Sequence, residues 1–441
     1  MKRVITYGTY DLLHQGHINL LRRAKEQGDY LIVGVTSDSF DRGRGKLNVR
    51  NNVLERVEAV KATGYADEVI IEDYLGQKID DIQKYDVDVF AIGSDWEGKF
   101  DYLNEYCKVV YLPRTEGISS TMLRAESQYE CKLGIVGAGR IAKRFVPETV
   151  VVNGVKVIGY YDTNPNSTLE QLKPFQTYQN LLTEVDAIYI ASPHLTHYEY
   201  AKAALEAGKH VLCEIPFTLN KEQALELYRL AEEKGLVLME ASKTAYCPAF
   251  CHLTTLVKSG IIGDVVDAKA SLSKMVQAPT RELNVEMAGG AMNEHAPLTL
   301  MAIIKLLGIN YSKVDFYSKM ENGVDVYTKA NICYPHATAS ITLGIGVKTE
   351  GNLVISGTKG YIYVPAPWWL TDFFEVRYED QTKNKKYFYS YDGEGLRYEI
   401  QEFMSMIVNK RASCYKFRKR ESVAIAEIIE KYNNKENLTI I

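Results

Sequence analysis

Short apolar runs alternate with amphipathic segments over residues 1–125 of the chain. The runs with the length of strands are Val4–Tyr7, Tyr30–Val35, Glu68–Ile71, Val87–Ile92 and Val109–Leu112. Strands that are apolar almost throughout are typical of parallel sheets covered on both faces. Between the first two runs, Ile18, Leu21 and Ala24 form the apolar stripe of a helix. We therefore predict a small doubly wound α/β domain over residues 1–125.

A second alternation of strands and helices begins at Lys132 and continues to about Met239. Beyond it the period changes, because apolar side chains at 266, 268, 270 and 272 alternate with polar ones, and the same holds from 337 to 343. Period two with one polar face indicates an open antiparallel sheet. We predict two Rossmann-like domains followed by an α+β domain. The expected boundaries are 1–125, a linker over 126–131, a dinucleotide-binding domain over 132–240 and a substrate or oligomerisation domain over 241–441.

Composition and charge narrow the class of protein. The chain has 441 residues, 46% of them hydrophobic and 24% charged, which is ordinary for a soluble globular protein of several domains. A net charge of −4 gives no reason to expect a nucleic-acid partner. No apolar run has the length of a signal peptide or of a membrane span. We expect a cytoplasmic homo-oligomer (a dimer or larger) that does not insert into membranes.

The cysteines do not predict a metal site. All seven are scattered, and none forms a CxxC pair. Cys247 and Cys251 lie beside His252, but buried thiols explain them better than metal ligands.

The segment His14-Gln15-Gly16-His17 is the most informative motif. It follows the first strand and its glycine turn, which is where open α/β sheets bind ligands. Two imidazoles at the start of a helix place two donors beside a positive dipole end, and Gly16 lets a phosphate approach the backbone. Attack of a phosphate oxygen on an α-phosphorus needs mainly positioning and neutralisation of the leaving charge. The motif in this context therefore predicts a nucleotidyltransferase, and two structural histidines are the alternative.

Three segments together resemble the bacterial glycerol-3-phosphate cytidylyltransferases. They are residues 7–17, 93–101 and 114–119, and the resemblance covers nearly all of the first 125 residues. It implies that the phosphates of CTP, with Mg²⁺, are held by Thr9, Tyr10, His14 and His17, and that Lys46 touches the triphosphate. It also implies that a further segment closes over the nucleotide and stabilises the transition state, namely Arg114, Thr115, Glu116, Gly117, Ile118, Ser119, Ser120 and Thr121. An adenylyl-transferring domain is a weaker alternative, because the 114–119 run resembles the cytidylyl-specific one.

The acceptor site departs from this family in two places. Arg44 stands where the family usually has a lysine that reaches the acceptor phosphate, and the segment from Lys46 to Asn52 is one residue longer than expected. Arginine keeps the charge but presents a planar fork. Lys78 is implied to bind the phosphate of the incoming alcohol. We expect a small polyol phosphate as the acceptor, without naming which one.

A second candidate centre follows the strand that begins at Leu133. Gly137-x-Gly139-x-x-Ala142 lies between that strand and a helix, and Asp162 closes the next strand. This combination predicts a dinucleotide-binding turn. A carboxylate at 162 accepts hydrogen bonds from ribose hydroxyls and repels a 2′-phosphate, so NAD(H) is favoured over NADP(H).

Residues 191–197 and 213–217, together with Gly289-Gly290-Ala291, resemble the glucose–fructose oxidoreductase and inositol dehydrogenase family from Lys132 to the C-terminus. The resemblance implies that six further residues surround the cofactor, namely Arg140, Ile141, Ser192, Pro193, His197 and Glu214. However, the lysine of the family's Glu-Lys-Pro is here Ile215, and its catalytic histidine or tyrosine falls on Leu298. Lys243 or His295 could supply the missing acid or base, or each could be structural.

Two functions remain open on the sequence. In one, the C-terminal half interconverts a keto-phosphate and a polyol phosphate, and the N-terminal half activates the polyol phosphate as a CDP-polyol for surface-polymer synthesis. In the other, a working cytidylyltransferase is joined to a catalytically silent dinucleotide-binding module that regulates or assembles it. Loss of the two usual catalytic positions favours the second function, whereas the complete cofactor turn favours the first.

Overall fold

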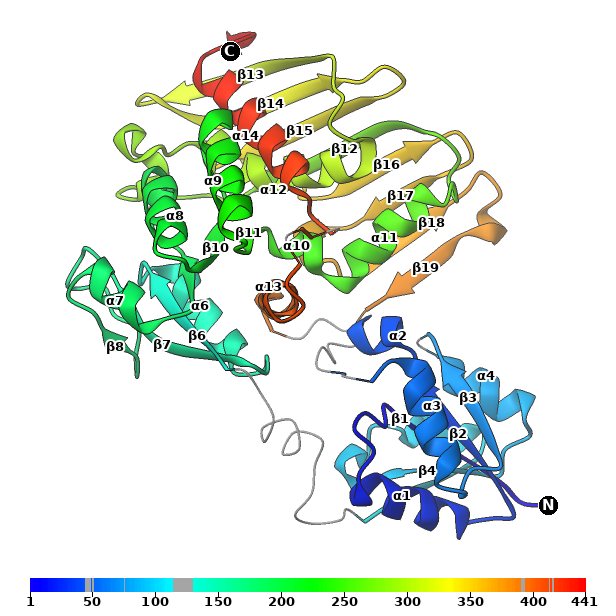
Figure 1. The fold of residues 1–441 in the computed structure, drawn as a ribbon. Coiled ribbons are helices and arrows are strands. Elements are labelled where there is room, and N and C mark those ends of the chain that lie inside the picture. Colours follow the sequence, from blue (N-terminus) through cyan, green and yellow to red (C-terminus); the bar gives the residue numbers. More distant parts are fainter. Residues whose placement is uncertain are drawn as a thin grey trace. The chain divides into compact units, whose positions relative to one another are not determined.

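Two separate units make up the chain, Met1–Tyr129 and Glu130–Ile441. The structure is a computed structural model that describes residues 1–43, 49, 51–74, 76–113, 130–389, 393–411, 413–414 and 416–441. The first unit contains one sheet, and the second contains two (Figure 1). Each unit is described below by itself.

The first unit is a five-stranded parallel sheet with the order β3-β2-β1-β4-β5. Its strands are β1 (Arg3–Gly8), β2 (Tyr30–Thr36), β3 (Glu68–Glu72), β4 (Val89–Gly93) and β5 (Lys108–Leu112). Its helices are α1 (Gln15–Lys25), α2 (Asp38–Gly43), α3 (Val53–Ala62) and α4 (Gln77–Lys84), with short 3₁₀ turns at Ser94–Trp96 and Asp101–Glu105. Leu21 and Val60 bury one face of the sheet, and Ile82 and Leu103 bury the other. The predicted doubly wound domain is confirmed.

The second unit begins with a six-stranded parallel sheet, in the order β11-β10-β9-β6-β7-β8. Its strands are β6 (Cys131–Val136), β7 (Val155–Tyr161), β8 (Lys173–Pro174), β9 (Ala187–Ile190), β10 (His210–Glu214) and β11 (Leu238–Ala241). Its helices are α6 (Arg140–Thr149), α7 (Tyr178–Glu184), α8 (His197–Glu206) and α9 (Lys221–Lys234). Helices α7, α8 and α9 share one apolar core with the sheet. On α6, the ring of Phe145 stacks on Tyr189 of β9 at 3.6 Å. The second predicted Rossmann-like domain is confirmed.

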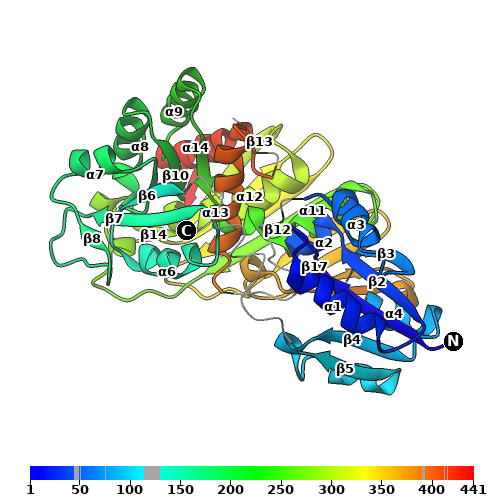
Figure 2. The same ribbon diagram turned by 60° about the horizontal axis from the view of Figure 1, so that its bottom comes forward.

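The last sheet has nine strands in the order β19-β18-β17-β16-β12-β15-β14-β13-β20. They are β12 (Val265–Ser273), β13 (Lys313–Glu321), β14 (Val324–Cys333), β15 (Thr338–Gly344), β16 (Leu353–Gly357), β17 (Tyr361–Val364), β18 (Phe373–Arg377), β19 (Lys385–Phe388) and β20 (Leu438–Ile440). The accompanying helices are α10 (Lys243–Tyr246), α11 (Pro248–Lys258), α12 (Ala291–Leu307), α13 (Leu396–Val408) and α14 (Lys419–Asn433). Helix α12 packs on β12, β14 and β15, and α14 packs on α12 and α9 (Figures 1 and 2).

This sheet is mixed, where the sequence predicted an antiparallel one. Strand β12 pairs with β15 in parallel, as β13 does with β20, and the other pairings are antiparallel. The parallel pairing arises because α12 carries the chain back across the sheet before β13, and two hairpins then return β15 beside β12. Period-two alternation is the same in both kinds of pairing, so it could not distinguish them.

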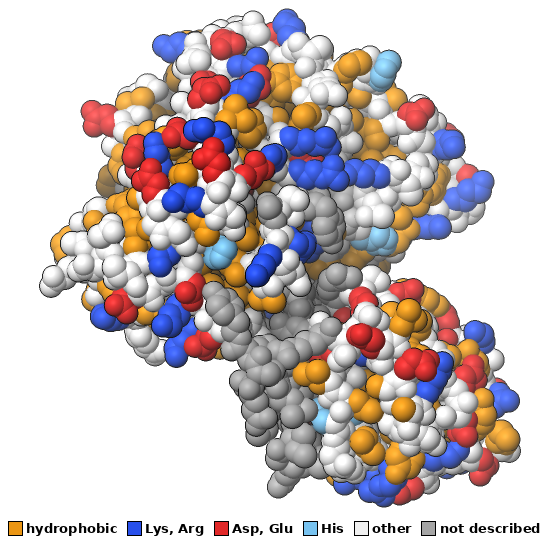
Figure 3. Space-filling view, in the orientation of Figure 1, with side chains coloured by type: hydrophobic (Ala, Val, Ile, Leu, Met, Phe, Trp, Pro, Cys, Tyr) orange, Lys and Arg blue, Asp and Glu red, His pale blue; other side chains and the backbone are white. Residues whose placement is uncertain are grey.

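Charged side chains of both signs are spread over the faces of both units that Figure 3 shows. Among the described residues, no helix is long and apolar enough to cross a membrane.

Candidate active sites

In the first unit, the loop between β1 and α1 lies at the carboxyl edge of the sheet. Tyr10 and Leu12 have positive φ angles of 53° and 47°, which side chains other than glycine seldom adopt. The ring of Tyr10 is buried against Gly8, where a Cβ atom would lie 2.9 Å from that ring. Strained backbone of this kind is typical of functional sites.

His14 and His17 lie together at the start of α1. Their rings stack with centroids 3.9 Å apart and planes 20° apart, and Tyr10 packs edge-on against His17 at 5.5 Å. The Gly16 N–H donates to Nδ1 of His14 at 3.1 Å, so His14 caps the helix and its neutral form has the proton on Nε2. The two imidazoles therefore lie at the positive end of a helix dipole, as an anion site requires.

A buried arginine forms hydrogen bonds with the backbone of this loop and with the carboxylates beside it. The side chain of Arg56 is fully buried, and its Nη1 atom donates to the Thr9 carbonyl at 2.7 Å and to Asp41 at 3.0 Å. Its Nη2 atom donates to Asp38 at 2.6 Å. The Thr9 hydroxyl donates to the other oxygen of Asp41 at 2.9 Å. One cation and two carboxylates thus fix the backbone that leads into the His14–His17 pair.

Our sequence analysis missed Arg56. The available signal was its place on α3, where it lies on the same buried side as Val57 and Val60. A charged side chain on the apolar side of a helix is rarely buried without partners. The Thr9 side chain, which belongs to this network, and the Tyr10 ring are both buried.

Lys78, on α4, reaches the same edge of the sheet. It forms an ion pair with Glu72 at the end of β3, and its Nζ atom lies 4.6 Å from the ring centroid of Tyr7. The Tyr7 hydroxyl donates to Asp81 at 2.8 Å, and burial together with that carboxylate raises the pKa of Tyr7. Lys78 therefore lies in a partnered, largely buried setting. Arg44, Lys46 and the segment 114–121 lie outside the described residues.

In the second unit, the glycine turn after β6 has the geometry of a dinucleotide site. Gly137 has a φ angle of 93°, and a Cβ atom there would lie 2.5 Å from the Ala191 carbonyl oxygen. Gly139 caps the N-terminus of α6, and nothing lies within 4 Å of the Cβ position there. Asp162 accepts the Ala138 N–H at 2.7 Å, so its carboxylate is fixed beside the turn. These residues fit a pyrophosphate at the helix N-terminus and a ribose at Asp162.

His197 connects two loops at the carboxyl ends of β9 and β10. Its Nδ1 atom lies 2.8 Å from the Pro216 carbonyl oxygen, and its Nε2 atom lies 2.8 Å from the Ser192 carbonyl oxygen. Burial lowers the pKa of His197, so the neutral ring donates to only one of the two. His197 therefore positions the loop that contains Ser192 and Pro193, and it is fully buried.

An arginine that the sequence analysis missed, Arg281, binds the carboxylate in the first turn of α12. Arg281 pairs with Glu294 at 2.8 Å, and its Nη1 atom lies 3.2 Å from Nε2 of His194. Burial lowers the pKa of the adjacent His295 to about 4, and its Nε2 atom has no hydrogen-bond partner among the described residues. Leu298 is buried one turn further along α12.

The Arg140 side chain pairs with Glu282 at 2.9 Å. Lys243, at the start of α10, donates to the Glu394 carbonyl at 2.8 Å. Glu214 accepts the Tyr189 hydroxyl, and burial raises the pKa of its carboxyl. The structure thus brings Lys243 and His295 into the second unit's interior from different helices.

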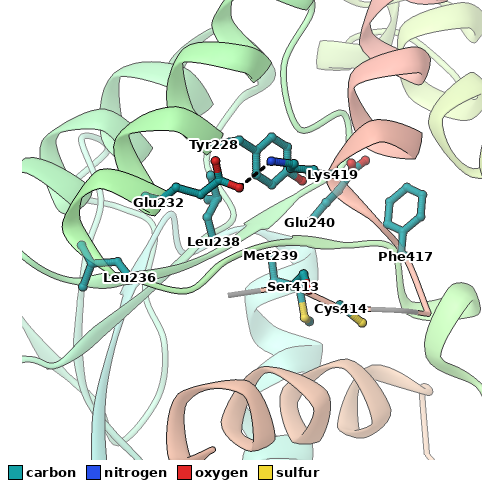
Figure 4. Close-up of a pocket in the computed structure, with 11 residues that line it drawn as sticks. Tyr228, Glu232, Leu236, Leu238, Met239, Glu240, Ser413, Cys414, Phe417 and Lys419 are labelled. Carbon is teal, nitrogen blue, oxygen red and sulfur yellow. Dashed lines mark hydrogen bonds and ion pairs between the residues drawn. The ribbon is translucent and has the colours of Figure 1, made fainter. Parts of the chain in front are cut away.

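A separate small pocket lies between α9, β11 and the segment that precedes α14 (Figure 4). Glu240 lies in its wall, and Glu232 and Lys419 pair across it at 2.5 Å. Strands β10 and β9 separate β11 from β6, so the pocket is apart from the glycine turn.

The two sites define a nucleotidyltransferase-like unit followed by a dinucleotide-binding unit, and comparisons with known proteins agree. Residues 5–126 match a family described as cytidylyltransferase-like, and residues 131–242 match an oxidoreductase family with an NAD-binding Rossmann fold. The glycerol-3-phosphate cytidylyltransferase of Staphylococcus aureus is 55% identical over 126 residues, which are 29% of this chain and 95% of that protein. The chain therefore belongs to the cytidylyltransferase family through its N-terminal segment and carries an oxidoreductase-family domain. Both resemblances are confirmed.

The second unit has more distant relatives. The trans-1,2-dihydrobenzene-1,2-diol dehydrogenase of Oryctolagus cuniculus is 28% identical over 269 residues, covering 58% of this chain and 82% of that protein. A crystal structure of a 3-ketoreductase from Actinomadura kijaniata, in complex with NADP and TDP-benzene, superposes with a TM-score of 0.64. It covers 71% of this chain and 99% of that chain at 21% identity, which shows a shared fold.

Proposed function

We propose that the chain is a bifunctional enzyme whose first unit transfers a cytidylyl group from CTP, with Mg²⁺, to a small polyol phosphate. The product would be a CDP-polyol and pyrophosphate. The stacked His14–His17 pair at the N-terminus of α1 supports this proposal most strongly, because it concentrates positive potential where the triphosphate must be neutralised. Glycerol phosphate is the first acceptor to test, since the similar Staphylococcus aureus protein is a glycerol-3-phosphate cytidylyltransferase.

The second unit would interconvert a keto-phosphate and a polyol phosphate with NAD(H), and so supply the acceptor of the first. The open space at Gly139 and the fixed carboxylate of Asp162 support binding of the cofactor. The preference for NAD(H) over NADP(H) belongs to the proposal, because Asp162 would repel a 2′-phosphate. We place the enzyme in the cytoplasm, as a homo-oligomer, in the synthesis of a surface polymer.

A regulatory role for the second unit is the rival proposal. Ile215 and Leu298 cannot donate or accept a proton, and they occupy the two positions that usually do. Under this proposal the unit would bind the dinucleotide without turning it over, and binding would change cytidylyl transfer or oligomeric state.

The experiment that separates these functions has two parts. A pyrophosphate-release screen would combine each nucleoside triphosphate with a panel of polyol phosphates. Nicotinamide absorbance would be followed with ketose phosphates in parallel. If CTP is the only nucleoside triphosphate that releases pyrophosphate with a polyol phosphate, and the nicotinamide is also turned over, the bifunctional enzyme is supported. Release without turnover, in a protein that binds the cofactor, supports the regulatory module.

A further inference from the structure

A lysine reaches the edge of the second unit's parallel sheet where the family's catalytic lysine is missing. Strands β10 and β11 are parallel neighbours, with Glu214 opposite Ala241 in their register. Ile215 follows Glu214, and Lys243 follows Ala241 by two residues, so both positions lie at the same carboxyl edge. Ligands of open α/β sheets bind at that edge. A lysine has thus been displaced by one strand and retained at the same end of the sheet.

Lys243 lies close enough to two carboxyls, those of half-buried Glu214 and fully buried Glu399, for its charge to act on both. Glu214 accepts the hydroxyl of Tyr189 on β9, whereas Glu399 extends from α13, which packs against α10. Glu399 is fully buried, and neither of its carboxyl oxygens has a hydrogen-bond partner among the described residues. Burial raises the pKa of both carboxyls, and the nearby Lys243 ammonium opposes this shift in each. The negative charge of Glu214 raises the pKa of Glu399 further.

The carboxyls of Glu214 and Glu399 can hold a proton and exchange it with Lys243. Two carboxyls that repel each other in a dry interior do not both ionise readily, so one proton stays on the pair. Lys243 is half-buried and makes its hydrogen bond to a neutral carbonyl, that of Glu394, at 2.8 Å. Its ammonium is therefore compensated by the carboxyl pair and not by a direct ion pair among the described residues.

We propose that Lys243 is the proton donor of the oxidoreductase unit and that Glu399 and Glu214 hold the proton that restores it. This inference rests on the proposed reduction of a ketone. A bound reduced nicotinamide would supply a hydride to the carbonyl carbon, and the electrons of the C=O π bond would move to oxygen. That oxygen takes a proton from the Lys243 ammonium and becomes a hydroxyl. The neutral amine then recovers a proton from the carboxyl pair, which is refilled from solvent.

His295 is the weaker candidate for this role. Burial keeps its imidazole neutral at physiological pH, and a neutral imidazole is a poor acid. The adjacent Glu294 is held by Arg281. Lys243 is the remaining candidate that is charged and close to groups that can return a proton.

The pH dependence of this group includes contributions from its neighbours. The charge of Glu148 on α6 also raises the pKa of Glu399, and Arg397 of α13 pairs with Glu148 at 2.8 Å. The other titratable groups around the cluster are Tyr189, Cys213, Glu240 and Tyr246. Glu240 accepts a hydrogen bond from the Ser422 hydroxyl, and burial is the largest cause of its raised pKa.

The test uses the full-length protein and two readouts. The first is oxidation of NADH and of NADPH from pH 5 to 9, with dihydroxyacetone phosphate, dihydroxyacetone and longer ketose phosphates. Lys243→Met should lower kcat by roughly 10²-fold or more and leave the cofactor Kd unchanged, whereas Lys243→Arg should recover part of the loss. Glu399→Gln should shift the pH profile of kcat. The matched control is Lys234→Met on the surface of α9, where Lys234 also donates to a backbone carbonyl, and it should not shift the profile.

The second readout is thermal stability of the cofactor-free protein against pH. A carboxyl whose pKa is raised in the folded state retains its proton after the unfolded chain has lost it, so it destabilises the fold as pH rises. The advantage of Glu399→Gln over the wild type should therefore widen from pH 5 to 9.

The outcomes separate the two proposals. If the wild type turns over and Lys243→Met is equally active, or if Glu399→Gln changes neither readout, the proton-donor assignment is wrong and the oxidoreductase activity stands. If the wild type binds the cofactor but none of the carbonyl compounds tested leads to its oxidation, the proposed reduction is wrong. The assignment of Lys243 is then wrong as well. Should Glu399→Gln not fold, the Lys243→Met and Lys243→Arg pair still decides the matter.

Discussion

The two units retain different parts of the chemistry that their families imply. In the first, the His14–His17 pair is complete, and a buried arginine holds the loop in front of it. In the second, the cofactor turn is complete, but the two positions where the family has proton-transferring residues are occupied by the apolar Ile215 and Leu298. The comparison teaches that a binding loop and a catalytic group can be lost or moved independently. Binding of the cofactor therefore does not by itself establish turnover.

The largest effect should come from the support beneath the first site. Arg56→Met removes the buried cation that pairs with the buried carboxylate of Asp41, so we expect the free energy of unfolding of the first unit to fall by about 3–5 kcal/mol. Hydrogen exchange, read separately for each unit, would measure the loss. Lys61→Met on the same helix breaks only an exposed pair with Glu58, and should change stability by less than about 1 kcal/mol. Equal effects of the two variants would contradict a supporting role for Arg56.

The next largest effect concerns the imidazole pair. His14→Ala and His17→Ala should each lower kcat for pyrophosphate release from CTP by roughly 10²-fold, because each removes a preorganised donor to the leaving phosphates. Arg114→Ala should act in the same direction. His336→Ala, at an exposed position after β14, serves as the control and should be fully active. Full activity in His17→Ala would remove the basis of the first assignment.

A third effect would sharpen the comparison inside the second unit. Burial lowers the pKa of His295 to about 4, so the unfolded chain binds a proton there that the folded protein does not. The wild type should therefore gain stability relative to His295→Gln as pH rises from about 4 to 6.5, by up to roughly 3 kcal/mol. Chemical denaturation at several pH values would show the trend. A difference that does not vary with pH would mean that His295 is accessible to solvent.

The smallest expected effect is on cofactor choice. NAD(H) should bind more tightly than NADP(H), and Asp162→Ala should narrow the gap by about tenfold, because the carboxylate no longer repels a 2′-phosphate. Calorimetry on the full-length protein would give both affinities. Equal affinities in the wild type would argue against Asp162 as the ribose ligand.

The sequence predicted the two parallel sheets well because most of their strands are largely apolar, and because a glycine turn lies at the end of the first strand in each sheet. It could not predict the parallel pairing of β12 with β15, because side chains alternate with period two in parallel and antiparallel strands alike. The local motifs of both sites, such as His14–His17 and Gly137–Gly139, were visible because their residues are adjacent in the chain. Arg56, Arg281 and Glu399 were missed because residues distant in sequence surround them, and only the fold brings these neighbours together.

The coupling of the two units can be measured in one reaction. Full-length protein would be incubated with CTP, Mg²⁺, NADH and dihydroxyacetone phosphate, and CDP-glycerol would be followed by chromatography with nicotinamide absorbance. We expect CDP-glycerol to form in proportion to the NADH consumed, and to disappear when either NADH or CTP is omitted. Formation of CDP-glycerol only when glycerol phosphate is added, with NADH unchanged across the ketose phosphates tested, would contradict the bifunctional enzyme.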